Sequence, residues 1–280
     1  MSGLLPTFII IGAMKAGTTS LAKYLARHPD VFMTIPKEPG FFDPTRNWDR
    51  GLEWYQGLFS TAGPDQARGE ASTMYSAAPH VPGVPERIAR VVPEVRLIYL
   101  IRNPVERIRS MYLHRVDRGQ ERGTLEEAVE QRSEYLDLSR YGFQLDQYLS
   151  VFPRQQILVL SSDQLRHERE RAVGDALHFV GVDADKPLPD VSREHHRGED
   201  KRRIWPLLEG PRSLLRKSGI MAVIPRSVKV RSRHALSGPI PEERTQIDPQ
   251  FASRLWSLLS EDLGRLRQIV GPEFYLWDRA

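Results

Sequence analysis

Residues 12–20 hold the side chains of this sequence whose types and spacing point most directly to chemistry. They read Gly-Ala-Met-Lys-Ala-Gly-Thr-Thr-Ser and join an apolar run at residues 8–11 to a helical pattern. Glycines let the backbone approach a ligand closely, and a helix start presents unpaired N–H groups with the positive end of the helix dipole. Lys15 adds a full positive charge, and the hydroxyls add further donors. This loop therefore predicts a site for a phosphate or sulfate group.

The position of the lysine separates this loop from the phosphate loops of ATP-hydrolysing enzymes. In those loops the lysine follows the second glycine and precedes a Ser or Thr that binds magnesium. Here Thr18 takes the lysine position, and Lys15 comes two residues before Gly17. The later strand that could supply a magnesium-binding aspartate ends instead in Arg102. This spacing disfavours a nucleotide kinase.

A second candidate anion site follows the apolar run at residues 96–101. Arg102 comes directly after that run, and Ser110 lies eight residues further on, in a predicted helix. Eight residues make about two helical turns, so the helix brings the hydroxyl back toward the arginine. A guanidinium and a hydroxyl together can grip a phosphate dianion. Taken alone, the pair equally fits an ion pair at a strand end and an ordinary helix residue.

Together, the two segments resemble the PAPS-dependent sulfotransferases, in particular the heparan sulfate and bacterial branches of that family. PAPS (3'-phosphoadenosine 5'-phosphosulfate) is the donor that this implies, and 3'-phosphoadenosine 5'-phosphate (PAP) is the product. The resemblance implies that the first loop holds the 5'-phosphosulfate, while the arginine and serine hold the 3'-phosphate. The donor residues are then Lys15, Ala16, Gly17, Thr18, Thr19, Ser20, Arg102 and Ser110.

A basic stretch near the C-terminus falls where the family carries a loop that closes over the nucleotide. It contains Arg231 and Arg233, although the usual glycine-containing pattern is not preserved. The two arginines are therefore candidates for donor binding. A plain solvated run of charge explains them equally well.

Residues 36–43, Pro-Lys-Glu-Pro-Gly-Phe-Phe-Asp, resemble the family segment that carries the catalytic base. The resemblance implies that Glu38 takes the proton of the acceptor and that Lys15 stabilises charge on the leaving phosphate. Without the resemblance, Glu38 reads as an exposed loop residue that pairs with Lys37. Sulfuryl transfer also requires the acceptor oxygen to lie in line with the leaving oxygen.

Four residues are candidates for contact with the acceptor: Lys37, Asp43, Tyr75 and His114. Asp43 either orients the acceptor or begins a turn. Tyr75 ends a segment, residues 70–75, that resembles a family element near donor and acceptor. His114 lies one helical turn beyond the serine of the second anion site. We expect a structural or acceptor-positioning role for it, with a role as alternative base left open.

Two positions depart from the pattern of the glycan-modifying members. Gly40 replaces a histidine that is common before the paired phenylalanines, and Ala71 replaces a lysine after Glu70. Two side chains that would meet a sulfated glycan are therefore missing. This departure disfavours a heparan-like acceptor.

Short apolar strands separated by helices predict an α/β fold, with a central parallel sheet flanked by helices. We expect strands at residues 8–11, 96–101 and 156–160, and helices at 18–27, from about 105, 141–151 and 161–181. The phosphosulfate loop is P-loop-like in its place between strand and helix. We expect a single domain over residues 1–280, with an irregular acceptor-side lid at about 183–244 and an amphipathic C-terminal helix at about 249–270.

Composition narrows the function classes further. The formal net charge is +4, and the chain has no cysteine, which excludes disulfides, thiolate metal sites and a cysteine nucleophile. The charge excess is small and lacks like-charge blocks, so it favours an anionic small ligand over nucleic acid. The N-terminus lacks a signal-peptide pattern, and no apolar run is long enough to cross a bilayer, so we expect a cytoplasmic protein.

We therefore predict metal-free transfer of a sulfuryl group from PAPS to a hydroxyl of a small-molecule, lipid or carbohydrate acceptor. Two alternatives stay open: a P-loop-type nucleotide kinase, and a non-catalytic module that binds a nucleotide or polyanion. Magnesium-dependent ATP turnover would identify the kinase. The presence of both Lys15 and Glu38 favours an enzyme over the module. No motif names the acceptor or the oligomeric state.

Overall fold

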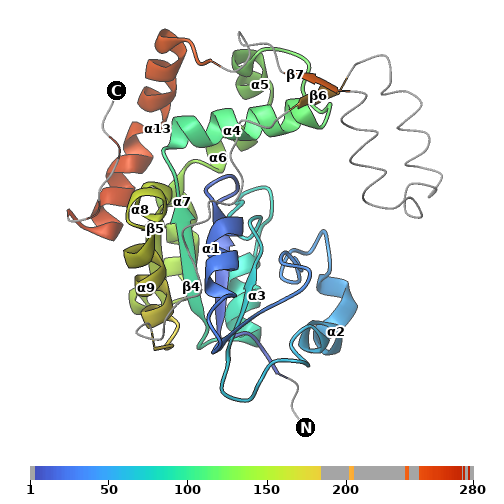
Figure 1. Ribbon diagram of the computed structural model, residues 1–280. Helices are drawn as coiled ribbons and strands as arrows, with labels where there is room; N and C mark the ends of the chain where they lie inside the picture. Colours follow the sequence, from blue (N-terminus) through green and yellow to red (C-terminus); the bar gives the residue numbers. More distant parts are fainter. Residues whose placement is uncertain are drawn as a thin grey trace, which may run out of the picture.

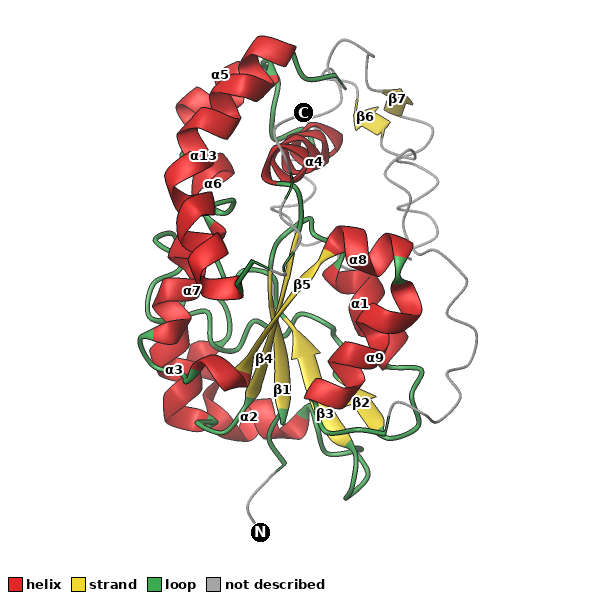
Figure 2. Cartoon of the chain, turned by 90° about the vertical axis from the view of Figure 1, so that its left-hand side faces the viewer, coloured by secondary structure: helices red, strands yellow, loops and turns green. Residues whose placement is uncertain are grey.

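Five parallel strands form the central sheet of the computed structural model, in the order β2-β3-β1-β4-β5 (Figures 1 and 2). The structure describes residues 4–183, 202–204, 237–239, 246–272, 274 and 277. The strands are β1 Phe8–Gly12, β2 Val31–Met33, β3 Ala67–Ala71, β4 Arg96–Ile101 and β5 Ile157–Ser161. Every residue of β1, the middle strand, is buried, as expected of a parallel sheet covered on both faces. The predicted α/β class is confirmed.

Helices cover both faces of the sheet and the edge at which its strands end. One face carries α1 (Thr18–Leu25), α8 (Ser162–His167) and α9 (Arg169–Phe179), and the other carries α3 (Val84–Val91) and α7 (Tyr141–Leu149) (Figure 2). The long helix α13 (Pro249–Val270) packs along α7. Helix α4 (Pro104–Asp117) crosses above the C-terminal ends of the strands (Figure 1). The other described α-helices are α2 (Gly51–Gly57), α5 (Leu125–Gln131) and α6 (Glu134–Asp137).

The single helix expected at residues 161–181 is wrong, because two helices occupy this stretch. Ser161 begins α8 with a capping box, and the backbone leaves the helical region at Glu168, where φ is −124° and ψ is 48°. The two helices bury apolar residues at different places. Leu165 of α8 approaches the loop at Gly17, whereas α9 packs against α1. The break lets α8 contact the loop while α9 packs against α1.

Short strands occur within the stretch that the sequence predicts to be irregular. Between residues 183 and 244, the structure describes little more than β6 (Arg202–Ile204) and β7 (Ser237–Pro239), which pair antiparallel. The β6 strand lies beside α4. The rest of the predicted lid, with Arg231 and Arg233, lies outside the described residues.

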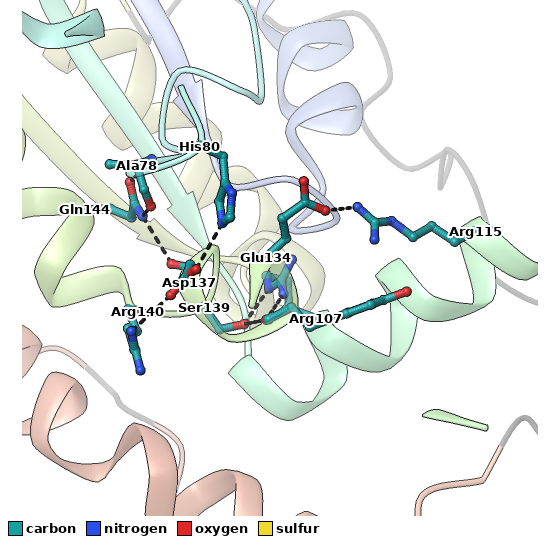
Figure 3. Close-up of polar contacts among 10 residues, drawn as sticks. Ala78, His80, Arg107, Arg115, Glu134, Asp137, Ser139, Arg140 and Gln144 are labelled. Atoms are coloured by element: carbon teal, nitrogen blue, oxygen red, sulfur yellow. Dashed lines mark hydrogen bonds and ion pairs between the residues drawn. The ribbon is translucent and has the colours of Figure 1, made fainter. Parts of the chain in front are cut away.

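A buried arginine anchors α4 above the sheet (Figure 3). The fully buried Arg107 donates from Nε to Ser139 Oγ (2.6 Å) and from NH2 to the carbonyl of Tyr135 (2.5 Å). Beside it, the Asp137 carboxylate pairs with His80 Nε2 (2.9 Å) and with Arg140 NH1 (3.0 Å). A buried guanidinium requires such partners, since an unpaired charge is costly in the interior. The contacts fix α4, and with it the residues that α4 presents to the sheet edge.

Candidate active site

The loop between β1 and α1 lies at the C-terminal edge of the sheet. The Ala13 N–H donates to the carbonyl of Leu100 on β4 (2.6 Å), which ties the loop to the neighbouring strand. Gly12 leaves no room for a side chain, because a Cβ there would lie 1.9 Å from Ser76 Oγ. Gly17 precedes α1 with a φ of 102°, a conformation that favours glycine. The first N–H groups of α1, which have no intrahelical partner, begin here, in an arrangement that binds anions.

Lys15 lies in this loop with a φ of 70°, which is uncommon for a residue with a side chain. Burial lowers the pKa of its ammonium, and the nearby charges of Arg118 and Arg102 lower this pKa further. The carboxylate of Glu38 raises the same pKa. Lys15 therefore lies where the loop, the predicted base and the second anion motif come together. A bound anion would relieve the repulsion among these cations.

The Lys37 ammonium joins the loop to the predicted base. Its Nζ atom donates to Thr18 Oγ1 and to Thr19 Oγ1, at 3.2 Å each, and to Glu38 Oε1 at 3.0 Å. Glu38 also accepts a long hydrogen bond from Thr73 Oγ1 (3.5 Å). The side chains of Lys37 and Glu38 are 23% and 37% exposed, so both remain accessible to a ligand. Residues that lie far apart in the sequence thus form one polar cluster.

The second anion motif lies at the end of β4 and on α4. Arg102 follows β4, and burial is the main cause that lowers its pKa. Its guanidinium contacts Glu106 Oε2 at 3.3 Å, a pair that a stronger anion could displace. The side chain of Asn103 caps α4 by accepting from the first free N–H groups. Ser110 and His114, both half-buried, follow on the same helix.

Asp43 and Tyr75 lie in the interior beneath this cluster. The Asp43 carboxylate is buried and accepts from Thr45 N (2.8 Å) and Thr45 Oγ1 (2.7 Å), which is the geometry of a turn. The Tyr75 hydroxyl donates to the buried Glu70 carboxylate (2.9 Å) and accepts from Phe42 N (3.1 Å). Both side chains thus support the loop that follows Glu38. Their contact with an acceptor stays a prediction.

Sequence reasoning missed two residues beside this cluster. Thr73, which donates to Glu38, lies within the segment 70–75 that resembles a family element, but no spacing distinguishes it from its neighbours there. Arg118 follows the last residue of α4, and its charge acts on Lys15. A signal for Arg118 was present, because Ser110, His114 and Arg118 recur every four residues and therefore share a helix face.

The arrangement is suited to binding an anion and removing a proton beside it. Lysine and arginine side chains, threonine hydroxyls and a helix start surround the loop, and the accessible carboxylate of Glu38 lies next to them. Within the described ranges, no three His, Asp or Glu side chains gather as metal ligands, and no helix is both long and apolar enough to cross a membrane. The chemistry on offer is electrostatic stabilisation and general base catalysis.

Comparison with protein families gives a match that covers most of the chain. The model described as "Sulfotransferase domain" matches residues 5–204. Among curated proteins, heparan sulfate glucosamine 3-O-sulfotransferase 6 of Mus musculus is 30% identical over 185 residues, which are 63% of this chain and 52% of that protein. Heparan sulfate glucosamine 3-O-sulfotransferase 3B1 of Homo sapiens is 29% identical over 187 residues, or 64% of this chain and 46% of that protein. The matches thus span about half the length of these relatives.

One solved structure is similar over nearly its whole length. A sulfotransferase from Alicyclobacillus acidocaldarius superimposes with a TM-score of 0.69 and 24% sequence identity, covering 95% of this chain and 96% of that chain. At this level of identity, the likeness concerns the fold. It agrees with the parallel sheet and the P-loop-like connection between β1 and α1.

Proposed function

The chain belongs to the sulfotransferase domain family, and from that premise we propose that it transfers a sulfuryl group from PAPS to a hydroxyl of an acceptor and releases PAP. One observation carries the proposal. The ammonium of Lys37 donates to both loop threonines and to Glu38, so the donor loop and the candidate base form one cluster. A transferase needs this proximity, because donor and acceptor react within about 3.5 Å of each other.

The residues of the chain suit the two ends of the proposed donor. At the 5' end, Lys15, the start of α1 and the hydroxyls of Thr18 and Thr19 provide positive charge and hydrogen-bond donors. At the 3' end, Arg102 and Ser110 provide a guanidinium and a hydroxyl. When bound, PAPS supplies the sulfuryl group and a phosphate that leaves with negative charge. Such a donor set favours an oxyanion at each end.

In the proposed reaction, Glu38 takes the proton of the acceptor hydroxyl as the acceptor oxygen forms its bond to sulfur. The bond between sulfur and the bridging oxygen breaks, and Lys15 stabilises the charge that develops on the departing phosphate. Lys37 holds the threonines of the loop beside the reacting groups. The proton ends on Glu38, and the electron pair of the broken bond ends on PAP.

We propose a small-molecule, lipid or carbohydrate acceptor that is not a sulfated glycan, although heparan sulfate appears in the names of the similar relatives. Ala71 offers no charge beside Glu38. Gly40 has a φ of 59°, and a Cβ there would lie 2.9 Å from Arg46 Cδ, so this backbone suits glycine and not a histidine. His114 remains the candidate for orienting the acceptor from α4.

The test combines a binding measurement with a transfer assay. Isothermal titration with PAP is expected to show binding, and labelled PAPS offered with hydroxylated lipids, sugars and phenols is expected to give a labelled product. Lys15→Ala and Glu38→Gln should each abolish transfer, while Glu38→Gln still binds PAP. Glu53→Gln, an exposed carboxylate on α2, is the matched control and should keep wild-type turnover. Failure to bind PAP would overturn the assignment of PAPS as the donor, and wild-type turnover of Glu38→Gln would overturn the assignment of Glu38 as the base.

A further inference from the structure

Glu70 is a fully buried carboxylate beneath the candidate base loop. It is the last residue but one of β3 and accepts three hydrogen bonds: from Tyr55 to Oε1 (2.7 Å), from Tyr75 to Oε1 (2.9 Å) and from Ser72 to Oε2 (2.6 Å). No cation contacts it among the described residues. Burying a carboxylate without a counter-charge is costly, even with good hydrogen bonds. The arrangement therefore calls for a reason beyond packing.

Two of the three hydroxyls that donate to Glu70 also accept hydrogen bonds from the backbone of the loop that carries Glu38. The Gly40 N–H donates to Ser72 Oγ (3.0 Å), and the Phe42 N–H donates to Tyr75 Oη (3.1 Å). On the other side of Glu38, the carbonyl of Lys37 accepts from Ala71 N (3.0 Å). Glu38 is thus held between a direct bond to β3 and two hydroxyl-mediated bonds that end on Glu70.

We propose that Glu70 is a positioning residue for the reaction, and that its ionised carboxylate orients Ser72 and Tyr75 to hold the loop of Glu38. Each hydroxyl has one proton, which it donates in a hydrogen bond to the ionised Glu70, so the lone pairs of the Ser72 and Tyr75 oxygens remain free to accept from the backbone N–H groups. A neutral Glu70 carries a proton of its own and must donate it to a neighbour. The hydroxyl that accepts this hydrogen bond can no longer donate its own to the same oxygen of Glu70, so one of the three contacts must rearrange. The inference rests on the proposed role of Glu38 as the base.

The groups that face Glu70 come from every element packed around it. They are Tyr55 of α2, Ser72 and Tyr75 after β3, Tyr148 of α7 and, at longer range, Glu38. Burial is the largest cause that raises the pKa of Glu70, to about 7, and the hydrogen bonds from the hydroxyls oppose it. The two forms of Glu70 are therefore both populated near neutral pH.

Amide signals of the full chain test the proposal directly. In ¹⁵N–¹H spectra, the Gly40 and Phe42 amides of the wild type are expected to shift together as the pH passes through about 7, and in Glu70→Gln this titration is lost. Glu70→Gln should lower kcat by about tenfold to hundredfold, because small displacements of a base are costly, and leave the KM for PAPS within about twofold. Ser72→Ala removes one of the two hydroxyl-mediated bonds and should lower kcat in the same direction.

Tyr55→Phe is the matched control. Tyr55 donates to Glu70 Oε1, as Tyr75 does, but in the described structure it bonds neither the Gly40 nor the Phe42 amide. The variant should keep kcat within about twofold at about pH 8.5, and move the amide titration to higher pH because the ionised form loses a donor. Wild-type amide titration in Glu70→Gln, or unchanged kcat in that variant, overturns the proposal. Wild-type turnover of Glu38→Gln instead removes the premise, so the two failures are distinguishable.

Discussion

Two lysines at the loop between β1 and α1 have different surroundings. Lys15 lies among cations, and burial together with Arg118 lowers its pKa. The Lys37 ammonium is satisfied by two hydroxyls and one carboxylate. An anion in the loop therefore relieves Lys15, whereas Lys37 holds its neighbours in place with or without one. At the residue scale, we assign charge stabilisation to the first lysine and geometry to the second.

Lys37→Met should lower kcat for sulfuryl transfer by about tenfold to hundredfold, because the two threonines lose their shared donor and Glu38 loses its partner. Steady-state kinetics with labelled PAPS measure the change. Lys23→Met on α1 is the control, since Lys23 is exposed and belongs to no part of the site. Equal turnover of the two variants would show that Lys37 has no role in the reaction.

Arg102→Ala should weaken the binding of PAP by about tenfold to hundredfold. This corresponds to about 1.5–3 kcal/mol, the contribution of a hydrogen bond to a charged group. The affinity for adenosine 5'-phosphate, which lacks the 3'-phosphate, should change little. Isothermal titration with both ligands measures the difference. Arg109→Ala serves as the control because Arg109 contacts the same Glu106. An equal loss for both ligands would disprove the assignment of the 3'-phosphate.

At the scale of elements, the strands that carry the anion motifs were predictable and the acceptor-side strands were not. β1 and β4 are continuous apolar runs, and each precedes its motif. β2 has only three residues, and β3 reads Ala-Arg-Gly-Glu-Ala, in which polar residues break the pattern of a buried strand. Glu70 fits inside β3 only because Ser72 and Tyr75, which follow the strand, and Tyr55 of α2 satisfy it. Side-chain hydrogen bonds of this kind leave no periodic signal in the sequence.

The connection from β1 to α1 should tolerate no side chain at its first glycine. Gly12→Ala places a Cβ 1.9 Å from Ser76 Oγ and should lower the free energy of unfolding by about 1–3 kcal/mol through overpacking. Gly174→Ala is the control, because a Cβ inside α9 meets nothing within 4 Å and should stabilise the helix by about 0.5–1 kcal/mol. Urea unfolding of both variants gives the comparison. A stabilised Gly12→Ala would contradict the loop geometry.

At the scale of the whole molecule, the site draws on segments spread over more than one hundred residues, from Lys15 to Arg118. The parallel sheet explains how they meet, since β1, β3 and β4 all end at one edge and α4 crosses above it (Figure 1). The sequence motifs could predict that Lys15, Glu38 and Arg102 gather at this edge. They could not predict that Lys37 bridges the loop and the base, because that contact depends on where β3 holds the intervening chain.

The same carboxyl that we assign to positioning the base should make the folded molecule less stable as it ionises. The pKa of Glu70 is raised from 4.5 to about 7, mainly by burial, so between these values the folded chain keeps a proton that the unfolded chain has lost. The stabilisation from this group is fully present below about pH 4.5 and is lost as the pH rises through about 7, at a cost of about 3 kcal/mol. In urea unfolding at pH 5 and pH 8, the wild type should therefore lose more stability than Glu70→Gln. Glu53→Gln, an exposed carboxylate on α2, should follow the wild type, and identical pH dependence of all three proteins would show that Glu70 ionises as readily in the folded chain as in the unfolded one.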